Sequence, residues 1–111
     1  MAKIIDPYGS ALVEDYQKVI DDFGLDIFDS SKLPEPNAIM RPGVVFASRR
    51  MNHIVDAIKN KKPSYVLSGI MPTNDRIHFG TKMVVENIRY FQEQGGHAYI
   101  LVADLEALAA R

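Results

Sequence analysis

Apolar residues in the first part of the chain recur at helical spacing and then give way to a loop. The helical set predicts a helix over about residues 12–23, followed by Gly24 as a favourable stop. Its apolar members are Leu12, Val13, Tyr16, Val19, Ile20 and Phe23. Residues 29–37 contain two prolines and two serines, so this segment is predicted to be a connecting loop.

The middle of the chain predicts a short strand followed by a second helix. Residues 43–47 read Gly-Val-Val-Phe-Ala, a short apolar run that favours a strand but is also compatible with a buried coil. Ser48 is a candidate N-cap for a helix over about residues 49–60. Pro63 prevents that helix from continuing.

The second half has a different pattern, in which short apolar runs flank a long amphipathic segment. Strands are predicted at residues 64–68 and 98–103, with a loop over 69–77 and a helix from 78 to about 94 between them. The run Ala-Tyr-Ile-Leu-Val-Ala at 98–103 is almost continuously apolar, as expected for a strand buried on both faces of a parallel sheet. This order predicts one β-α-β unit of an α/β fold.

A further helix is predicted to begin at residue 104, close to the end of the sequence. A doubly wound sheet normally has more strands than one crossover supplies. The pattern therefore favours a fragment of a larger domain, or a domain completed by another chain.

Composition narrows the class of protein. The 111 residues are 47% apolar and 24% charged, and their net charge of −1 argues against a basic nucleic-acid-binding domain. Cysteine is absent, which excludes disulfides and thiolate metal sites. No signal-peptide pattern or membrane-spanning run is visible, so we expect a soluble, cytoplasmic protein.

The loop and helix start at residues 69–81 carry the candidate chemistry. A helix N-terminus directs backbone N–H groups toward an anion, and a glycine such as Gly80 allows close approach. His78 could donate to phosphate oxygens, and the Thr81 hydroxyl could add a second donor. In the plainer interpretation, Gly69 and Gly80 are turn and cap glycines, and the two polar residues only begin the helix.

Ser-Gly-Ile-Met-Pro at 68–72 followed by His-Phe-Gly-Thr at 78–81 resembles the first ATP-binding signature of class I aminoacyl-tRNA synthetases. More narrowly, the chain resembles the N-terminal part of an archaeal-type tryptophanyl-tRNA synthetase. Segments that carry this resemblance are spread over nearly the whole chain: residues 6–9, 13–16, 23–24, 40–46, 62–63, 82–85 and 103–107.

The resemblance implies the first half of a Rossmann-like class I synthetase catalytic domain, preceded by a mostly helical N-terminal extension. The implied boundaries are 1–62 for the extension and 63–111 for the truncated β-α-β unit. Thr81 stands where the family usually has a second histidine, and Ser48-Arg49-Arg50 replaces a usual His-Arg-Asp. The second family signature, with its phosphate-stabilising lysine, is absent from the sequence.

The same resemblance implies the site residues. As catalytic residues it implies His78 and Thr81. As ATP-binding residues it implies Gly69, Met71, Pro72, His78, Gly80 and Thr81. As amino-acid-binding residues it implies Leu67, Ser68, Gly69 and Glu106, the last as the acceptor of the indole N–H. ATP would bring Mg²⁺ through its own phosphates, without a protein-bound metal.

The implied function is tryptophan activation with ATP and transfer to tRNA(Trp), by a tryptophan–tRNA ligase of which this chain is a fragment. Its partners would be tryptophan, ATP and tRNA(Trp), with a possible homodimer of the full-length enzyme and no membrane. Two alternatives stay open at this point. One is a non-catalytic nucleotide-binding or interaction module derived from a synthetase. The other is a tyrosyl-type synthetase fragment, because the related tyrosyl enzymes tend to have a histidine at the position of Glu106.

Overall fold

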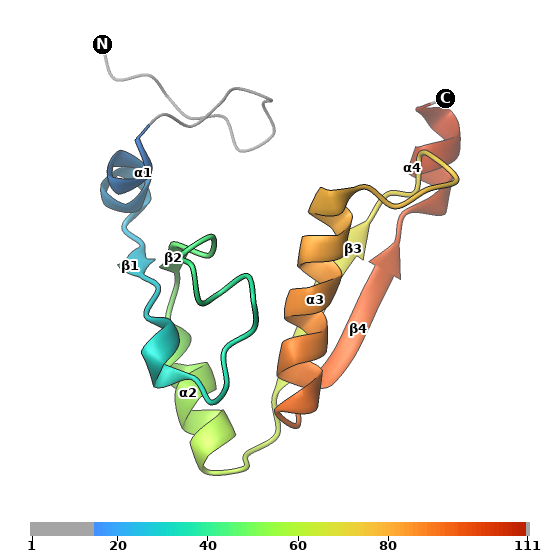
Figure 1. The fold of residues 1–111 in the computed structure, drawn as a ribbon. Coiled ribbons are helices and arrows are strands. Elements are labelled where there is room, and N and C mark those ends of the chain that lie inside the picture. Colours follow the sequence, from blue (N-terminus) through green and yellow to red (C-terminus); the bar gives the residue numbers. More distant parts are fainter. Residues whose placement is uncertain (1–14, 111) are drawn as a thin grey trace.

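The computed structural model describes residues 15–110, which form a helix-rich first half and a β-α-β second half (Figure 1). In chain order the elements are α1 (Tyr16–Phe23), β1 (Asp26–Ile27), the 3₁₀ helix η1 (Ser30–Lys32), β2 (Ala47–Ser48), α2 (Met51–Lys59), β3 (Tyr65–Ile70), α3 (Phe79–Glu93), β4 (His97–Val102) and α4 (Asp104–Ala109). The predicted helix start at 12–14, the resemblance at 6–9 and the last residue of the predicted unit, 111, lie outside the described residues.

The β-α-β prediction is confirmed. Strands β3 and β4 pair in parallel, from Tyr65 opposite His97 to Ile70 opposite Val102, and α3 forms the crossover between them (Figure 1). A parallel pair requires such a crossover, because a short hairpin cannot return the chain in the same direction. This part of the chain is a partial Rossmann-like α/β fold.

Local capping chemistry explains where the first helix begins and ends. Asp15 is the N-cap of α1, and its carboxylate accepts from the N–H of Lys18 at 3.1 Å. Gly24 ends the helix with φ of +58°, in the left-handed region that glycine adopts at low cost. The predicted stop at Gly24 is therefore confirmed.

The turn between α3 and β4 depends on Gly95 and Gly96. Gly95 has φ of +97°, and a Cβ on Gly96 would lie 2.9 Å from the carbonyl oxygen of Phe91. Only glycine fits both demands, so the chain can reverse directly from the helix into β4.

The middle of the chain differs from the prediction. The expected strand at 43–47 is wrong for most of its length, because Gly43 has φ of +78° in a turn and pairing is confined to β2. Strand β2 pairs antiparallel with β1, which the sequence pattern did not reveal. Ser48 lies in β2 and does not cap α2. The N-cap position of α2 is Arg50, with φ of +55° and no side-chain cap.

The buried core joins the first half of the chain to α3. Tyr90 of α3 is 4% exposed and forms a cluster with Phe28, Leu33 and Met40. Its hydroxyl donates to the carbonyl oxygen of Pro34. The segment between α1 and β2, of which only residues 29–37 were predicted to be a loop, thus supplies several of the most buried apolar side chains that the structure describes.

Asn37 stabilises the same contact through both ends of its amide. Its oxygen accepts from the N–H groups of Ile39 and Met40, at 3.0 and 2.9 Å, and so shapes the turn that buries Met40. Its nitrogen donates to the side-chain oxygen of Asn87 at 3.1 Å. One side chain therefore links the loop of the first half to α3.

We expect Asn37→Ala to destabilise the chain by about 1–3 kcal/mol, because several partly buried polar groups lose their partner at once. The midpoint and slope of urea unfolding measure this free energy. Asn60→Ala is the matched control: Asn60 is exposed and bonds only to Asp56 within α2, so its loss should change stability by no more than about 0.5 kcal/mol. Equal effects of the two substitutions would contradict the role given to Asn37.

One face of the parallel sheet is open among the described residues. Side chains at alternate positions of β3 and β4 face away from α3, and Tyr65, Leu67 and Leu101 are 69%, 69% and 67% exposed. The prediction that β4 is buried on both faces is therefore wrong for this chain, because the described residues place a helix against only one face. An apolar sheet face of this kind is typical of a surface that another layer of structure covers.

Candidate functional site

The candidate site lies at the carboxyl ends of the two parallel strands. β3 ends at Ile70 and continues into the loop 71–78, and β4 ends at Val102 and continues into α4. The N–H of Ala103 donates to the carbonyl oxygen of Ile70 at 2.9 Å, which aligns the two strand ends. Ligands of open α/β sheets bind outside this edge, so the fold places the loop and the start of α4 where such a ligand would lie.

His78 begins α3 and caps it with its own ring. Its backbone is extended, with φ of −82° and ψ of 169°, and its Nδ1 accepts from the backbone N–H of Thr81 at 3.2 Å. The Thr81 hydroxyl lies 3.4 Å from the other ring nitrogen, Nε2. The two residues predicted to be catalytic are therefore in direct contact.

Gly80 leaves space for the His78 ring. A Cβ added at Gly80 would lie 3.2 Å from both Cε1 and Nδ1 of that ring, closer than ordinary contact. From the sequence, the missing side chain of Gly80 was expected to let an anion approach the backbone. In the structure the adjacent space is filled by the imidazole, so Gly80 serves the packing of His78.

The start of α3 keeps free donors for an anion. The first N–H groups of a helix have no acceptor within it, and of these the group on Thr81 bonds to His78. The groups on Phe79 and Gly80 precede it and point in the same general direction, along the positive end of the helix dipole. This arrangement can stabilise a phosphate, provided that the ring and the loop leave it room.

The loop encloses only a small hollow beside His78, of about 50 Å³. The residues that line it are Ile70, Met71, Pro72, Thr73, Asn74, Arg76, Ile77, His78 and Thr81. Small-molecule sites commonly occupy roughly 300–1,000 Å³, so the hollow is too small for a whole nucleotide. A nucleotide therefore needs either a rearranged loop or additional walls.

Arg76 lines this hollow and was not among the residues predicted for the site. A guanidinium is suited to bidentate contact with phosphate. The signal that could have revealed it is a lone cation in the loop, two residues before the histidine that begins the helix.

Gly69 lies in β3, so its predicted place in the loop is wrong. The strand continues to Ile70 because each of its residues has a partner on β4, and Gly69 pairs with Leu101. Leu67 and Gly69 face the open side of the sheet, whereas Ser68 faces α3. The side chains of Leu67 and Ser68 thus lie on opposite faces of the sheet. Both residues can contact the same ligand through their backbone groups, but not through both side chains.

Glu106 lies in the first turn of α4 and is exposed. Its carboxylate makes no hydrogen bond or ion pair with any other residue in the range 15–110. The next residue, Ala107, is 4% exposed and anchors the helix. An acceptor without a partner at the same edge of the sheet as His78 is available to a ligand.

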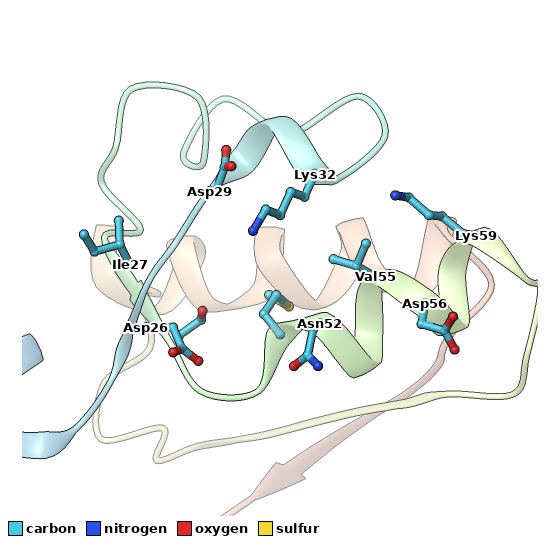
Figure 2. A pocket seen from close by; sticks show the side chains of 10 residues that line it. Asp26, Ile27, Asp29, Lys32, Asn52, Val55, Asp56 and Lys59 are labelled. Atoms are coloured by element: carbon cyan, nitrogen blue, oxygen red, sulfur yellow. The ribbon is translucent and has the colours of Figure 1, made fainter.

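A larger hollow, of about 470 Å³, lies in the first half of the chain, away from the predicted site residues (Figure 2). Its rim carries Lys32 and Lys59 as well as carboxylates, over an apolar floor that includes Val55. The chain itself engages all three carboxylates. The Arg50 N–H donates to Asp26 at 3.3 Å, hydrogen bonds from Ser31 lower the pKa of Asp29, and the ammonium of Lys62, 2.9 Å away, lowers the pKa of Asp56.

The described residues include neither a metal-binding cluster nor a membrane-spanning helix. Among residues 15–110 no three histidine, cysteine or acidic side chains gather as they would around a metal ion. In the same range no helix has the length and apolar character needed to span a bilayer.

Comparison with known proteins gives consistent matches. The family model of the class I tRNA synthetases for W and Y matches residues 59–111. Tryptophan–tRNA ligase 1 of Halobacterium salinarum is 42% identical over 109 residues, which are 96% of this chain and 21% of that protein. The crystal structure of tryptophanyl-tRNA synthetase from Aeropyrum pernix K1 superposes with a TM-score of 0.71 at 34% identity, over 96% of this chain and 30% of that chain. A synthetase of Encephalitozoon cuniculi, solved with tryptophan, shares the fold with a TM-score of 0.70 at 24% identity, over 86% of this chain and 34% of that one.

The β-α-β unit, the histidine that begins its helix and these matches make the chain similar to the class I aminoacyl-tRNA synthetases, whose family model covers its residues 59–111. Within that family it matches archaeal tryptophan–tRNA ligases over 96–99% of its length at 34–42% identity. It spans only 21–31% of the length of those relatives. The chain is thus similar to a part of such an enzyme.

Proposed function

We propose that the chain supplies the ATP-binding start of a tryptophan-activating synthetase. The observation that carries the proposal is the contact between His78 and Thr81 at the start of α3, directly after the carboxyl end of β3. The archaeal relatives, which are named tryptophan–tRNA ligases, support the same role. The boundary at 62/63 between an N-terminal extension and the β-α-β unit is part of this proposal.

In the proposed reaction the carboxylate of tryptophan attacks the α-phosphorus of ATP. An O–P bond forms to give tryptophanyl-adenylate, the bond to the bridging oxygen breaks, and pyrophosphate leaves. The His78 ring and the N–H groups of Phe79 and Gly80 stabilise the phosphates, because negative charge on them grows in the transition state. Mg²⁺ arrives with ATP, and the tRNA(Trp) 3′ end then accepts the aminoacyl group in the cytoplasm.

The other proposed ligand contacts surround this centre. Met71, Pro72 and Thr81 line the small hollow beside His78, with Arg76 as an additional cation for phosphate. Backbone groups of Leu67, Ser68 and Gly69 and the carboxylate of Glu106 bind tryptophan. The hollow enlarges when the remainder of the catalytic domain adds walls to it.

A chimera tests the proposal. This chain replaces the matching 109 residues of the Halobacterium salinarum ligase, and ATP–pyrophosphate exchange is measured with tryptophan, with tyrosine and without amino acid. We expect exchange that depends on tryptophan. Exchange with tyrosine alone would indicate a tyrosyl-type fragment. A folded chimera that exchanges with neither would contradict the proposal and favour a non-catalytic module.

Glu106 sets the choice of amino acid in this proposal. In the chimera, Glu106→Ala should raise the KM for tryptophan by roughly tenfold, because the indole N–H loses a charged acceptor, and a hydrogen bond to a charged group contributes about 1.5–3 kcal/mol. The KM for ATP should change little. Asp104→Ala is the matched control, since Asp104 is an exposed carboxylate of the same helix turn that accepts from Leu105 N–H. A change in the KM for ATP as large as that for tryptophan would contradict this role.

A further inference from the structure

Thr81 makes two contacts with the His78 ring, and these indicate which ring nitrogen carries the proton. Its Nδ1 accepts the backbone N–H of Thr81 at 3.2 Å, so Nδ1 carries a lone pair and no proton. A neutral imidazole with an unprotonated Nδ1 carries its proton on Nε2. The cap of α3 therefore selects the Nε2–H tautomer.

The direction of the second contact follows from the first. Nε2 lies 3.4 Å from the Thr81 hydroxyl oxygen, and because Nε2 carries the proton, the ring donates and the hydroxyl accepts. The ring also lies over Gly80, in space that is open only because Gly80 has no side chain: its atoms lie 3.2 Å from the position of an added Cβ. Thr81 is half-buried, whereas His78 is exposed to solvent and to any ligand outside the strand ends.

We propose that Thr81 is a positioning residue: its backbone N–H and its hydroxyl hold His78 as a neutral Nε2–H donor aimed at an incoming phosphate. The inference rests on the proposed function, because its final acceptor is an ATP phosphate oxygen. In this role the Thr81 hydroxyl is a temporary hydrogen-bond acceptor for the His78 ring, whereas the sequence predicted that it donates directly to phosphate.

The length of the Nε2–Oγ1 contact suggests that a phosphate oxygen can replace the Thr81 hydroxyl as the acceptor. At 3.4 Å the Nε2–Oγ1 pair exceeds the usual range of roughly 2.7–3.2 Å for N–H···O bonds, so the hydroxyl orients the proton without binding it firmly. An anionic phosphate oxygen forms a shorter, charge-assisted bond of about twice the strength of a neutral one. A phosphate oxygen should therefore replace the Thr81 hydroxyl as the acceptor of the Nε2–H hydrogen bond. The Thr81 N–H continues to donate to Nδ1.

The test is a long-range ¹H–¹⁵N spectrum of the histidine rings in the full chain, labelled with ¹⁵N-histidine. The His78 signals are those missing from His78→Asp, and His97→Gln identifies a ring that lies outside the candidate site. We expect His78 as the Nε2–H tautomer in the wild-type chain and in Thr81→Ser. In Thr81→Val, which keeps the backbone N–H and the shape, the Nε2 proton should exchange with water roughly three- to tenfold faster, as for the loss of one hydrogen bond.

Two results would overturn the positioning role. One is a proton on Nδ1 in the wild-type chain, a measurement that needs no variant to fold. The other is an Nε2 proton in folded Thr81→Val that exchanges as in the wild type. MgATP is then added: a shift of the His78 Nε2 signal supports phosphate as the acceptor. An unmoved signal, with the tautomer as expected, would instead contradict the proposed nucleotide role and leave the Thr81–His78 contact supported.

Discussion

In the chimera, His78→Ala lowers tryptophan-dependent ATP–pyrophosphate exchange by roughly 100- to 1,000-fold, the usual cost of removing one preorganised donor to a charged transition state. The loss should fall mainly on kcat, because the charge on the phosphates grows as the Pα–O bond breaks. Steady-state exchange at varied ATP separates kcat from KM. A fall in kcat of less than about threefold would contradict the role of His78.

His78 also caps α3, so its loss could act through the helix alone. A missing N-cap costs about 0.5–2 kcal/mol of stability. His78→Asp separates the two roles, because an aspartate accepts the Thr81 N–H as the imidazole does and suits the positive end of the helix dipole. We expect this variant to keep the wild-type unfolding midpoint and to lose exchange at least as fully as His78→Ala. An aspartate variant with normal exchange would show that the cap alone matters.

The second half of the chain could be predicted from sequence because its signals are local. α3 follows from apolar spacing and from the glycines that end it, and β3 and β4 are apolar runs on either side of it. The pairing of β1 with β2 could not be predicted in this way. Each of these strands has two residues, and they meet only because the chain between them folds back onto α3.

The sequence placed His78 at the start of a helix, where the structure has it, but did not predict its contacts. The histidine at the helix start was found from its place between a strand and a helix. Its use as an N-cap was not, because serine, threonine, aspartate and asparagine are the usual cap residues. The alternation along β3 places Leu67 and Ser68 on opposite faces, which residue identities alone do not show. The burial expected for β4 depends on layers that the described residues do not supply.

Tyr90→Ala should destabilise the chain by about 3–5 kcal/mol, the usual cost of removing a large buried aromatic side chain. Total stabilities of domains are about 5–15 kcal/mol, so the variant loses a large share of its stability. The effect should be large because the ring packs against Phe28, Leu33 and Met40 and stands edge-on to Phe91, with centroids 5.2 Å apart. Urea unfolding followed by circular dichroism measures it. Tyr99→Ala, on the open sheet face, is the matched control and should cost far less.

Tyr90→Phe isolates the hydroxyl, which donates to the carbonyl oxygen of Pro34. We expect a loss of about 0.5–1.5 kcal/mol near neutral pH. Burial, and next the charge of Glu35, raise the pKa of Tyr90 above its ordinary value of about 10. Between that value and the raised one the unfolded chain releases the proton first, so stability falls as pH rises through this window. The Phe variant lacks this fall, and its deficit against the wild type should shrink there. A deficit that grows above about pH 10 would contradict the burial of the Tyr90 hydroxyl, and with it the contact that joins the first half of the chain to α3.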